Sequence, residues 1–337
     1  MGTLPAVVDT PVSEEIRGAF PRFFAEHRDG QGFFNPWGRM PVKSPRELWE
    51  WQRGENPFKT EKATPPPVKR AADPRGEFEA LDPRGRLLWL GHASVLIEID
   101  GVRVLVDPVF GRASPAVPRK VPAPLRPDAL PRVDVVVVTH GHYDHLDRPS
   151  VRALARRFGA EVLFVVPLGL GKSLPRACQR VVELDWWQQV QVRGVGVHLV
   201  PAQHWHRRSL LDTNKALWGG CVVSGSHSVY HSGDTGFYEG FSVIGQVFSG
   251  LSAAVLPLGA YEPRWFMGSQ HMNPAESVQA FLDLGAQHFV GMHWGTFDLT
   301  DEPLDHGART LLPRLIAERD LNPERFHVLP HGGGLGL

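Results

Sequence analysis

The side chains best suited to chemistry lie in the run 139–147, which has the sequence THGHYDHLD. Within six residues this run holds three histidines and one aspartate: His140, His142, Asp144 and His145. Imidazole and carboxylate groups without a nearby thiolate favour zinc, with manganese and iron as alternatives. Ionisable groups at the end of a buried strand are costly to desolvate, so a neutralising cation is expected. The run therefore predicts a transition-metal site, and its ligands differ enough in reach to face two ions.

Three further candidate ligands follow apolar stretches later in the chain: His204, Asp234 and His293. Each lies in a loop at the end of an expected strand, where functional residues are commonly held on a rigid scaffold. A lone histidine in such a place is more often a hydrogen-bonded structural residue. Because the dense run is also present, we interpret the three residues as members of the same metal site.

Asp107 is a candidate for orienting one of the ligand histidines. It ends an expected strand as an Asp-Pro pair, and its carboxylate can accept a hydrogen bond from the second ring nitrogen of a ligand imidazole. His92 and Asp147 are weaker candidates for the same role.

Strands must position these side chains, because alternating or continuous apolar stretches dominate the chain from residue 86 onward. Strands are expected at 87–90, 94–99, 102–107, 133–139, 161–166, 181–184, 190–200, 219–224, 228–232, 253–258, 287–292 and 326–330. Helices are expected at 149–158, 274–284 and 305–318. Two groups of strands with intervening helices predict an α/β fold. Two sheets pack face to face with helices outside, forming one four-layer domain over 86–337.

Residues 1–85 are rich in proline, glycine and charge, and they predict an irregular N-terminal arm packed on the main domain. Short helices are expected at 12–27 and 44–53, and three prolines at 65–67 interrupt the arm. The aromatic residues of the arm are Phe33, Phe34, Trp37, Trp49 and Trp51. We expect these rings to pack on the main domain; the alternative is that some of them line a groove for an apolar substrate.

Charge and cysteine content exclude several classes of protein. Lys plus Arg and Asp plus Glu number 36 each, so no net field attracts nucleic acid or an anionic membrane. The two cysteines, Cys178 and Cys221, argue against a disulfide framework and suit a reducing cytoplasm. The first residues lack the pattern of a secretory signal, and no apolar stretch is long enough to cross a bilayer. We expect a cytoplasmic protein without a nucleic-acid partner, and leave open peripheral membrane contact and a homodimer.

The His-x-His-x-Asp-His run, joined to the three later ligands, resembles the metallo-β-lactamase superfamily. Within it, the chain closely resembles the N-acyl-phosphatidylethanolamine-hydrolysing phospholipase D family. The segments that carry the resemblance are 34–37, 89–93, 139–147, 166–169, 183–187, 203–205, 259–267 and 293–297. They extend from near residue 33 to the C-terminal part of the chain, and so cover most of it.

The resemblance implies an αββα sandwich with a dizinc centre at the open edge of its two sheets. The implied ligands of one zinc ion are His140, His142 and His204; those of the other are Asp144, His145 and His293. Asp234 and a hydroxide would bridge the two ions, and Asp144 is expected to be catalytic as well as a ligand. Flavodiiron-type sites place glutamate at the position of His142, and class B β-lactamases use a cysteine ligand, so the chain departs from both patterns.

The activity implied by the resemblance is that of a phospholipase D. The bridging hydroxide would attack a phosphodiester in line, releasing phosphatidic acid and an N-acylethanolamine from an N-acyl-phosphatidylethanolamine-like lipid. The alternative is a hydrolase of the same fold that acts on a lactone, a thioester, a cyclic phosphodiester or a carbon–halogen bond. A metal-binding scaffold without activity is disfavoured, because every expected ligand is present.

Several residues after the second half of the ligand set are candidate substrate contacts. Gln270 and His271 resemble the family's substrate-proximal Gln-His pair, and His271 is expected to be catalytic or to contact phosphate. The alternative for His271 is a loop histidine that caps the next helix. Arg264 suits bidentate contact with phosphate, with an ion pair to a nearby carboxylate as the alternative. Tyr261 and Trp218 are expected near the metal edge, where they either contact lipid or pack the wall.

Overall fold

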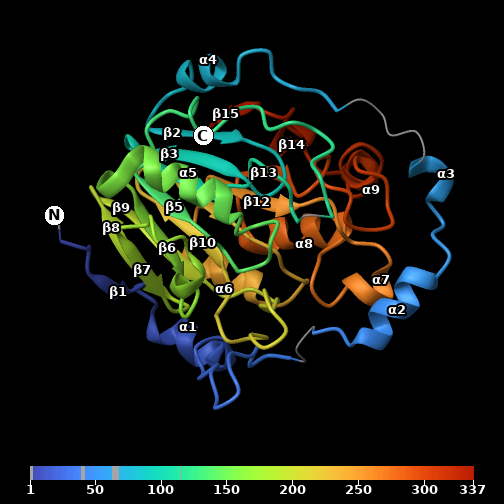
Figure 1. Cartoon of the computed structure of the whole chain (residues 1–337), viewed down its shortest axis with the longest axis horizontal. Coiled ribbons are helices and arrows are strands. Elements are labelled where there is room, and N and C mark those ends of the chain that lie inside the picture. Colours follow the sequence, from blue (N-terminus) through green and yellow to red (C-terminus); the bar gives the residue numbers. More distant parts are fainter. Residues whose placement is uncertain (1–2, 39–41, 63–67, 115) are drawn as a thin grey trace.

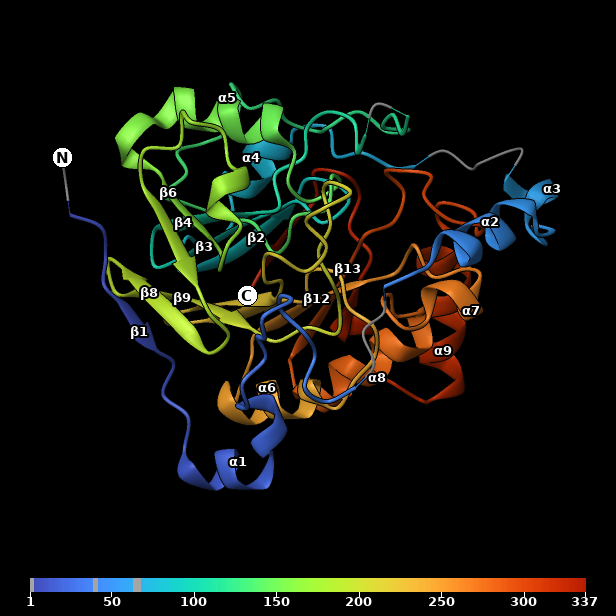
Figure 2. The same ribbon diagram turned by 60° about the horizontal axis from the view of Figure 1, so that its bottom comes forward.

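The computed structural model describes residues 3–38, 42–62, 68–114 and 116–337. The proline run 65–67, expected to interrupt the N-terminal arm, lies outside these residues. Two mixed β-sheets face each other, and helices cover their outer surfaces (Figure 1). Figure 2 shows the resulting four layers. The predicted α/β sandwich is confirmed.

One sheet has seven strands in the order β15-β2-β3-β4-β5-β6-β7. Its strands are β2 (Gly85–Trp89), β3 (Val95–Ile99), β4 (Val102–Val106), β5 (Val135–Val137), β6 (Leu163–Pro167), β7 (Val181–Leu184) and β15 (Gly334–Gly336). The neighbours from β15 to β4 are antiparallel, and those from β4 to β7 are parallel. The carboxyl ends of β4 to β7 therefore share one edge of the sheet.

The other sheet has eight strands in the order β1-β8-β9-β10-β11-β12-β13-β14. They are β1 (Val7–Asp9), β8 (Gln188–Val192), β9 (Val195–Val200), β10 (Gly220–Ser224), β11 (Ser228–His231), β12 (Ala253–Pro257), β13 (His288–Met292) and β14 (Phe326–His327). The neighbours from β11 to β14 are parallel, and the others are antiparallel.

The α-helices are α1 (Glu14–Ala19), α2 (Pro45–Arg53), α3 (Lys59–Lys62), α4 (Pro74–Glu79), α5 (Arg148–Phe158), α6 (Gly240–Val247), α7 (Arg264–Met267), α8 (Pro274–Leu284) and α9 (Leu312–Glu318). Alternation along β4 shows how the layers form. Val104 and Val106 enter the core between the sheets, whereas Leu105 packs with Val151 and Leu154 of α5 on the outer face. On the far side α8 packs against β12, α6 and α9. No helix within the described ranges is long and apolar enough to cross a membrane.

Several expected elements differ from the observed ones. The helix expected at 12–27 is limited to α1, which a separate 3-10 turn (Pro21–Phe23) follows, and the strand expected at 326–330 ends at His327. The single strand predicted at 190–200 is wrong, because β8 and β9 form a hairpin through Arg193 and Gly194. These two residues have φ angles of 47° and 87°, as a tight turn between antiparallel strands requires. The helix predicted at 305–318 is also divided: a π-helical turn (His306–Leu311) precedes α9.

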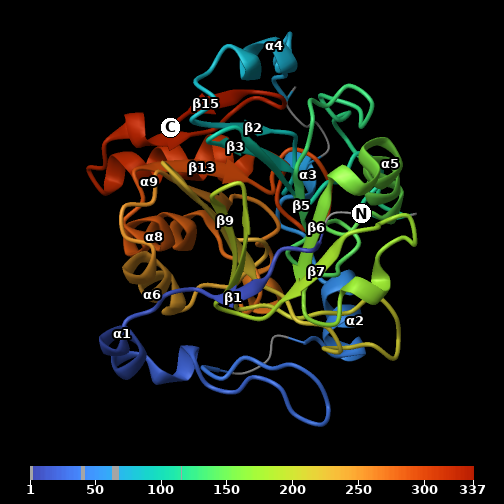
Figure 3. The same ribbon diagram turned by 90° about the vertical axis from the view of Figure 1, so that its left-hand side faces the viewer.

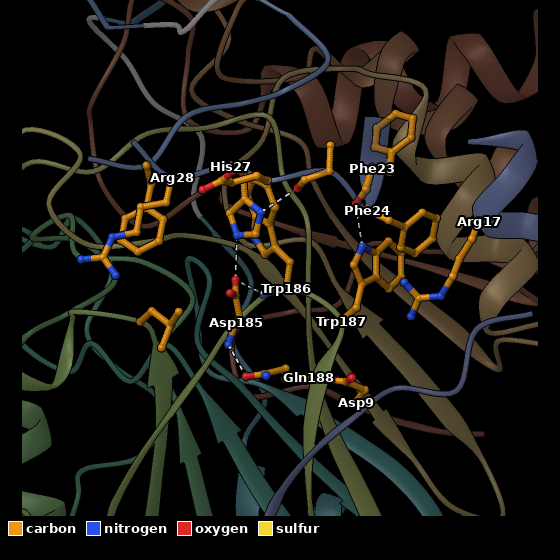
Figure 4. Close-up of a pocket in the computed structure, with 14 residues that line it drawn as sticks. Asp9, Arg17, Phe23, Phe24, His27, Arg28, Asp185, Trp186, Trp187 and Gln188 are labelled. Carbon is orange, nitrogen blue, oxygen red and sulfur yellow. Dashed lines mark hydrogen bonds and ion pairs between the residues drawn. The ribbon is translucent and has the colours of Figure 1, made fainter. Parts of the chain in front are cut away.

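The N-terminal segment contributes to both the sheet and the core. β1 lies at the edge of the eight-stranded sheet beside β8 (Figure 2), and Figure 3 views the molecule from the side on which β1 lies. Phe23 and Phe33 belong to the buried core, and the backbone carbonyl of Phe23 accepts a hydrogen bond from the indole of Trp187 at 2.8 Å. His27 Nε2 lies 2.7 Å from Asp185 Oδ1. A cavity of about 430 Å³ adjoins this junction (Figure 4). Part of the expected arm is thus built into the main sandwich.

A buried ionic cluster holds α4 against the seven-stranded sheet. Arg86 on β2 and Glu98 on β3 are 3% and 5% exposed, and Arg86 Nε donates to Glu98 Oε2 at 2.8 Å. The same carboxylate oxygen accepts from Arg103 Nε at 3.0 Å. Arg86 also donates to the carbonyl of Phe78 in α4 at 2.7 Å. Glu98, together with the more exposed Glu79 that lies 3.1 Å from both arginines, neutralises the two guanidinium groups, and Glu98 is the buried one of these two carboxylates.

Replacement of Glu98 by alanine is expected to lower the free energy of unfolding by about 3–5 kcal/mol, because it leaves the buried guanidinium of Arg86 without its main counter-ion. Urea unfolding followed by circular dichroism measures this change. The matched control is Asp82→Ala, which removes a carboxylate from an exposed pair with Arg84 and should change stability little. Equal effects of the two substitutions would contradict a structural role for the cluster.

Candidate metal centre

The seven predicted metal ligands lie together at one edge of the sandwich. Four stand on the loop after β5, and the others follow β9, β11 and β13. With one added histidine they form two groups whose ligand atoms lie within 4.8 Å of one another in each group. The groups are His140, His142, His204 and Asp234, and His92, Asp144, His145 and His293. Loops from both sheets therefore build the centre.

In the first group, three imidazole nitrogens converge. His142 Nδ1 lies 3.0 Å from His140 Nε2 and 3.1 Å from His204 Nε2. Burial lowers the pKa of His142 to about 3, and it holds the pKa values of His140 and His204 well below the usual range. The three rings are thus neutral near pH 7, and neutral imidazole is the form that binds a metal.

In the second group, Asp144 lies among three imidazoles. Its Oδ2 is 3.1 Å from His92 Nε2 and 3.8 Å from the Nε2 atoms of His145 and His293. Burial, and next the proximity of His293, lowers the pKa of His92 to about 3. Asp144 is 17% exposed, whereas the imidazoles of His145 and His293 are fully buried. The carboxylate therefore faces the more open side of the group.

Asp234 belongs to the first group and also contacts the second. Its Oδ2 is 3.0 Å from His145 Nε2 and 3.8 Å from His140 Nε2, and its Oδ1 is 3.0 Å from His293 Nε2. Burial alone would raise the pKa of Asp234, but His145 and His293 hold it well below its usual range. One ionised carboxylate thus contacts the histidines of both groups.

Hydrogen bonds orient the rings from behind. Asp107 is fully buried, and its Oδ2 lies 2.7 Å from His145 Nδ1. The same carboxylate accepts from the Thr139 backbone N–H at 2.7 Å and from the Thr139 hydroxyl at 2.6 Å. His204 Nδ1 lies 3.2 Å from the backbone carbonyl of Gln270. These contacts direct the remaining ring nitrogen of each histidine toward the centre.

The electrostatics of the centre favour bound positive charge. Asp107, Asp144 and Asp234 place three carboxylates within the buried region, and their ion-pair partners are imidazoles. Burial disfavours a charged His145, but Asp234, Asp107 and Asp144 outweigh it and raise the pKa of His145 well above its usual value. A proton on His145 and a metal cation would therefore compete for the same ring nitrogen.

The donor atoms fit a pair of divalent cations. His145 Nε2, His293 Nε2 and Asp234 Oδ1 are buried and, apart from the 3.0 Å ion-pair contacts of the two histidines with Asp234, have no hydrogen-bonding partner among the residues that the structure describes. Buried polar atoms without partners are rare and costly, and a cation would satisfy all three. Four nitrogen and oxygen donors in each group suit zinc, manganese or iron. Cys178 and Cys221 belong to neither group.

The structure brings one of the predicted substrate contacts to the centre. His271 Nδ1 lies 3.9 Å from Asp234 Oδ2, and its ring centroid is 5.5 Å from that of His204. Burial lowers the pKa of His271 to about 4, so this imidazole is neutral near pH 7. Gln270 lies next to it, but its side-chain oxygen accepts from Trp205 Nε1 at 2.6 Å. Gln270 thus supports the wall and orients His204 through its carbonyl.

Three other predicted contacts have structural partners instead. Trp218 is fully buried, and its indole donates to the carbonyl of Ala202 at 2.9 Å. Tyr261 is 1% exposed, with its hydroxyl 2.7 Å from His306 Nδ1. Arg264 Nη2 donates to Glu276 Oε2 at 2.7 Å. In this conformation none of the three presents a free polar group to a ligand at the centre. For Arg264, the alternative of an ion pair with a carboxylate is therefore the one observed, and the carboxylate is that of Glu276.

His92, predicted as a weaker candidate for orienting a ligand, is the added member of the second group and lies 3.1 Å from Asp144 Oδ2. It lies after β2 with a φ of 54°, and its backbone N–H donates to the Thr296 hydroxyl at 2.8 Å. Its carbonyl accepts from the His293 backbone N–H at 3.0 Å and so connects the two sheets. In the sequence, the indication of its importance was its place in the family segment 89–93. Asp147, the other weak candidate, caps α5 through the Ser150 N–H.

Comparisons with known proteins agree with this architecture. A profile of the beta-lactamase superfamily domain matches residues 102–294. An uncharacterized protein of Mycobacterium tuberculosis is 42% identical over 238 residues, which cover 66% of this chain and 62% of that protein. The chain thus spans less than two thirds of the length of this relative.

A relative that is named for its activity and a solved structure extend the comparison. The N-acyl-phosphatidylethanolamine-hydrolyzing phospholipase D 1 of Caenorhabditis elegans is 36% identical over 262 residues, covering 72% of this chain and 73% of that protein. The structure of Igni18, a metallo hydrolase from Ignicoccus hospitalis, matches with a TM-score of 0.58 and 20% identity, covering 75% of this chain and 98% of that one. At this identity the structural likeness shows the fold alone.

Proposed function

The chain belongs to the beta-lactamase superfamily, in the family that includes the N-acyl-phosphatidylethanolamine-hydrolyzing phospholipases D, and from this premise we propose that it is a zinc-dependent phosphodiesterase. Its substrates are N-acyl-phosphatidylethanolamine-like lipids, and its products are phosphatidic acid and an N-acylethanolamine. The observation that carries the proposal is the pair of four-residue groups, which the carboxylate of Asp234 in the first group connects.

The reaction needs two kinds of help from the site. A bound pair of zinc ions would lower the pKa of water toward about 7 and neutralise the charge that develops on a phosphodiester. Asp107 and the Gln270 carbonyl hold His145 and His204 in orientation, so the donor atoms are in place before substrate arrives. This order of events avoids reorganisation during the chemical step.

His271 and Asp144 occupy the side of the centre that solvent reaches. The side chain of His271 is 14% exposed and that of Asp144 is 17% exposed, so each has one edge directed outward. A neutral imidazole carries one N–H, which can donate to a phosphate oxygen or to the departing alkoxide. We assign this role to His271, because it lies against Asp234 without being one of the eight grouped residues.

Metal analysis tests the proposal first. Purified protein is expected to contain about two zinc ions per chain by plasma mass spectrometry. Removal of the metal with a chelator should abolish phosphodiester hydrolysis, and addition of zinc should restore it. Restoration by manganese or iron alone would replace zinc in the proposal. Full activity of a metal-free preparation would refute it.

A substrate panel tests the reaction. N-acyl-phosphatidylethanolamine, a small aryl phosphodiester and a lactone are each incubated with the zinc-loaded protein, and products are identified by mass spectrometry. Release of phosphatidic acid and N-acylethanolamine supports the proposed activity. Turnover of the lactone alone would instead indicate a hydrolase of the same fold with a different electrophile.

A further inference from the structure

The loop 205–215 exposes two adjacent leucines almost completely. Leu210 is 93% exposed and Leu211 is 90% exposed. The other exposed large hydrophobic side chains in the described part of the chain range from 37% to 55%. Exposed apolar side chains that lie together commonly mark a surface that binds another protein or a membrane.

Hydrogen bonds hold these leucines outward in a closed turn. Asp212 Oδ1 accepts from the backbone N–H of Ser209 at 2.7 Å and of Arg208 at 3.0 Å, which fixes the tip. At the base, the Asn214 N–H donates to the His206 carbonyl at 2.8 Å, and the His206 N–H donates to Asn214 Oδ1 at 3.1 Å. The leucines therefore project from a constrained turn with both its tip and its base closed.

The turn is also attached to the loop 139–147, which holds four of the grouped residues. Arg208 Nη1 donates to the backbone carbonyl of Gly141 at 2.6 Å and to that of Leu146 at 3.0 Å. In return, the Tyr143 hydroxyl donates to the Arg208 carbonyl at 2.8 Å. The loop begins directly after His204, one of the grouped ligands. Whatever binds the two leucines is thereby held close to the metal centre.

Basic side chains lie on the same loop as the leucines and along the adjoining cavity. Arg207 precedes the turn and is exposed, with its guanidinium 5.3 Å from the Trp205 ring centre. A neighbouring cavity of about 400 Å³ is lined by Arg208 of the loop, by Tyr143, and by Arg112 and Arg148. The carboxylates on the same segments are Asp212 in the turn and Asp147 at the start of α5, so the four arginines outnumber them. The local charge is therefore complementary to an anionic surface, although the chain as a whole is neutral.

We propose that the loop 205–215 docks the protein on an anionic phospholipid bilayer, with Leu210 and Leu211 entering the acyl-chain boundary and Arg207 facing lipid phosphates. Apolar side chains with basic ones beside them are the combination that binds such an interface. The inference rests on the proposed function, because it brings the metal centre to a phospholipid substrate.

Vesicle sedimentation of the full zinc-loaded chain tests the proposal. The parent protein should bind vesicles of phosphatidylcholine mixed with phosphatidylglycerol more tightly than vesicles of phosphatidylcholine alone. The double variant Leu210→Ser with Leu211→Ser should bind the mixed vesicles more weakly than the parent by a factor of about ten or more. Arg207→Gln should weaken binding to the mixed vesicles about fivefold and leave binding to phosphatidylcholine vesicles unchanged.

Matched variants and a second measurement make the result decisive. Leu4→Ser with Leu282→Ser removes two exposed leucines elsewhere, and Arg314→Gln removes an exposed charge on α9; both should bind vesicles as the parent does. Metal content and melting temperature confirm folding of every variant. Equal vesicle binding by the parent and the loop variants would overturn the proposal. So would concentration-dependent self-association that the loop variants abolish, since a second copy would then cover the leucines. Vesicle binding without phosphodiester hydrolysis would instead refute the proposed function and leave the docking surface standing.

Discussion

Replacement of Asp234 by asparagine is expected to abolish phosphodiester hydrolysis, with a loss of about 10³-fold or more. The asparagine side chain has the same size but only one oxygen and no charge. In the native centre one oxygen of Asp234 lies 3.0 Å from His145 and the other 3.0 Å from His293. Those two histidines belong to the second group, and Asp234 is itself a member of the first, where its Oδ2 lies 3.8 Å from His140 Nε2, so asparagine removes an anionic contact from both groups at once. Metal content should fall from about two ions per chain to about one or fewer.

The control for this substitution is Asp128→Asn, which makes the same chemical change at a carboxylate that is 72% exposed and pairs with Arg126. Its turnover and metal content should equal those of the parent. Steady-state kinetics and plasma mass spectrometry on the same preparations measure both quantities. A fully active Asp234→Asn protein that retains two metals would show that this carboxylate does not join the groups.

The ligand residues could be predicted from the sequence because their signal is local. Four of them lie in the dense run that follows β5, His204 and His293 lie in the family segments 203–205 and 293–297, and Asp234 was chosen because it follows an apolar stretch. All seven fall in the two groups that the structure assembles. The strand pattern was equally local, since continuous apolar runs predict buried strands of parallel sheets. The turn between β8 and β9 was missed because arginine at a positive φ is uncommon.

The directions of side chains were harder to predict than their positions. Arg264 and Tyr261 have the chemistry to bind a phospholipid, but each already has a partner, Glu276 and His306. Residue type suggests what a side chain can bind, whereas the rotamer and the neighbouring elements decide what it does bind. His92 shows the reverse case: its place beside Asp144 depends on a positive φ and on a contact with the loop after β13.

The contact between Asp107 and His145 shows which part of the site could be predicted from the sequence and which part could not. Asp107 and His145 are 38 residues apart, and the parallel pairing of β4 with β5 brings their loops together. The Asp-Pro pair at the end of an expected strand suggested the role of Asp107, but not its contact with Thr139. That contact needs the register of the two strands, in which Val106 lies opposite Val137.

Replacement of Asp107 by asparagine is expected to lower metal affinity about 10- to 100-fold. The carboxylate faces three donors or ring nitrogens, on Thr139 and His145, within 2.7 Å or less. An amide group offers one acceptor and two N–H donors, so at least one donor of Thr139 or His145 would face another donor. The imidazole of His145 would lose the partner that fixes its orientation.

If Asp107 acts by positioning His145, excess zinc should restore the activity of the Asp107→Asn protein. General destabilisation of the fold would not be reversed in this way. In buffers of controlled free zinc, the Asp107→Asn protein should reach nearly parental turnover once zinc exceeds its weakened dissociation constant, with the half-saturating concentration shifted about 10- to 100-fold. The control is Asp134→Asn at the opposite end of β5, where a buried carboxylate pairs with Arg193 rather than with a ligand. That variant should lose stability without a shift in zinc dependence, because its partners are far from the imidazoles. If excess zinc fails to restore a folded Asp107→Asn protein, the carboxylate acts on the reaction itself and not through the orientation of His145.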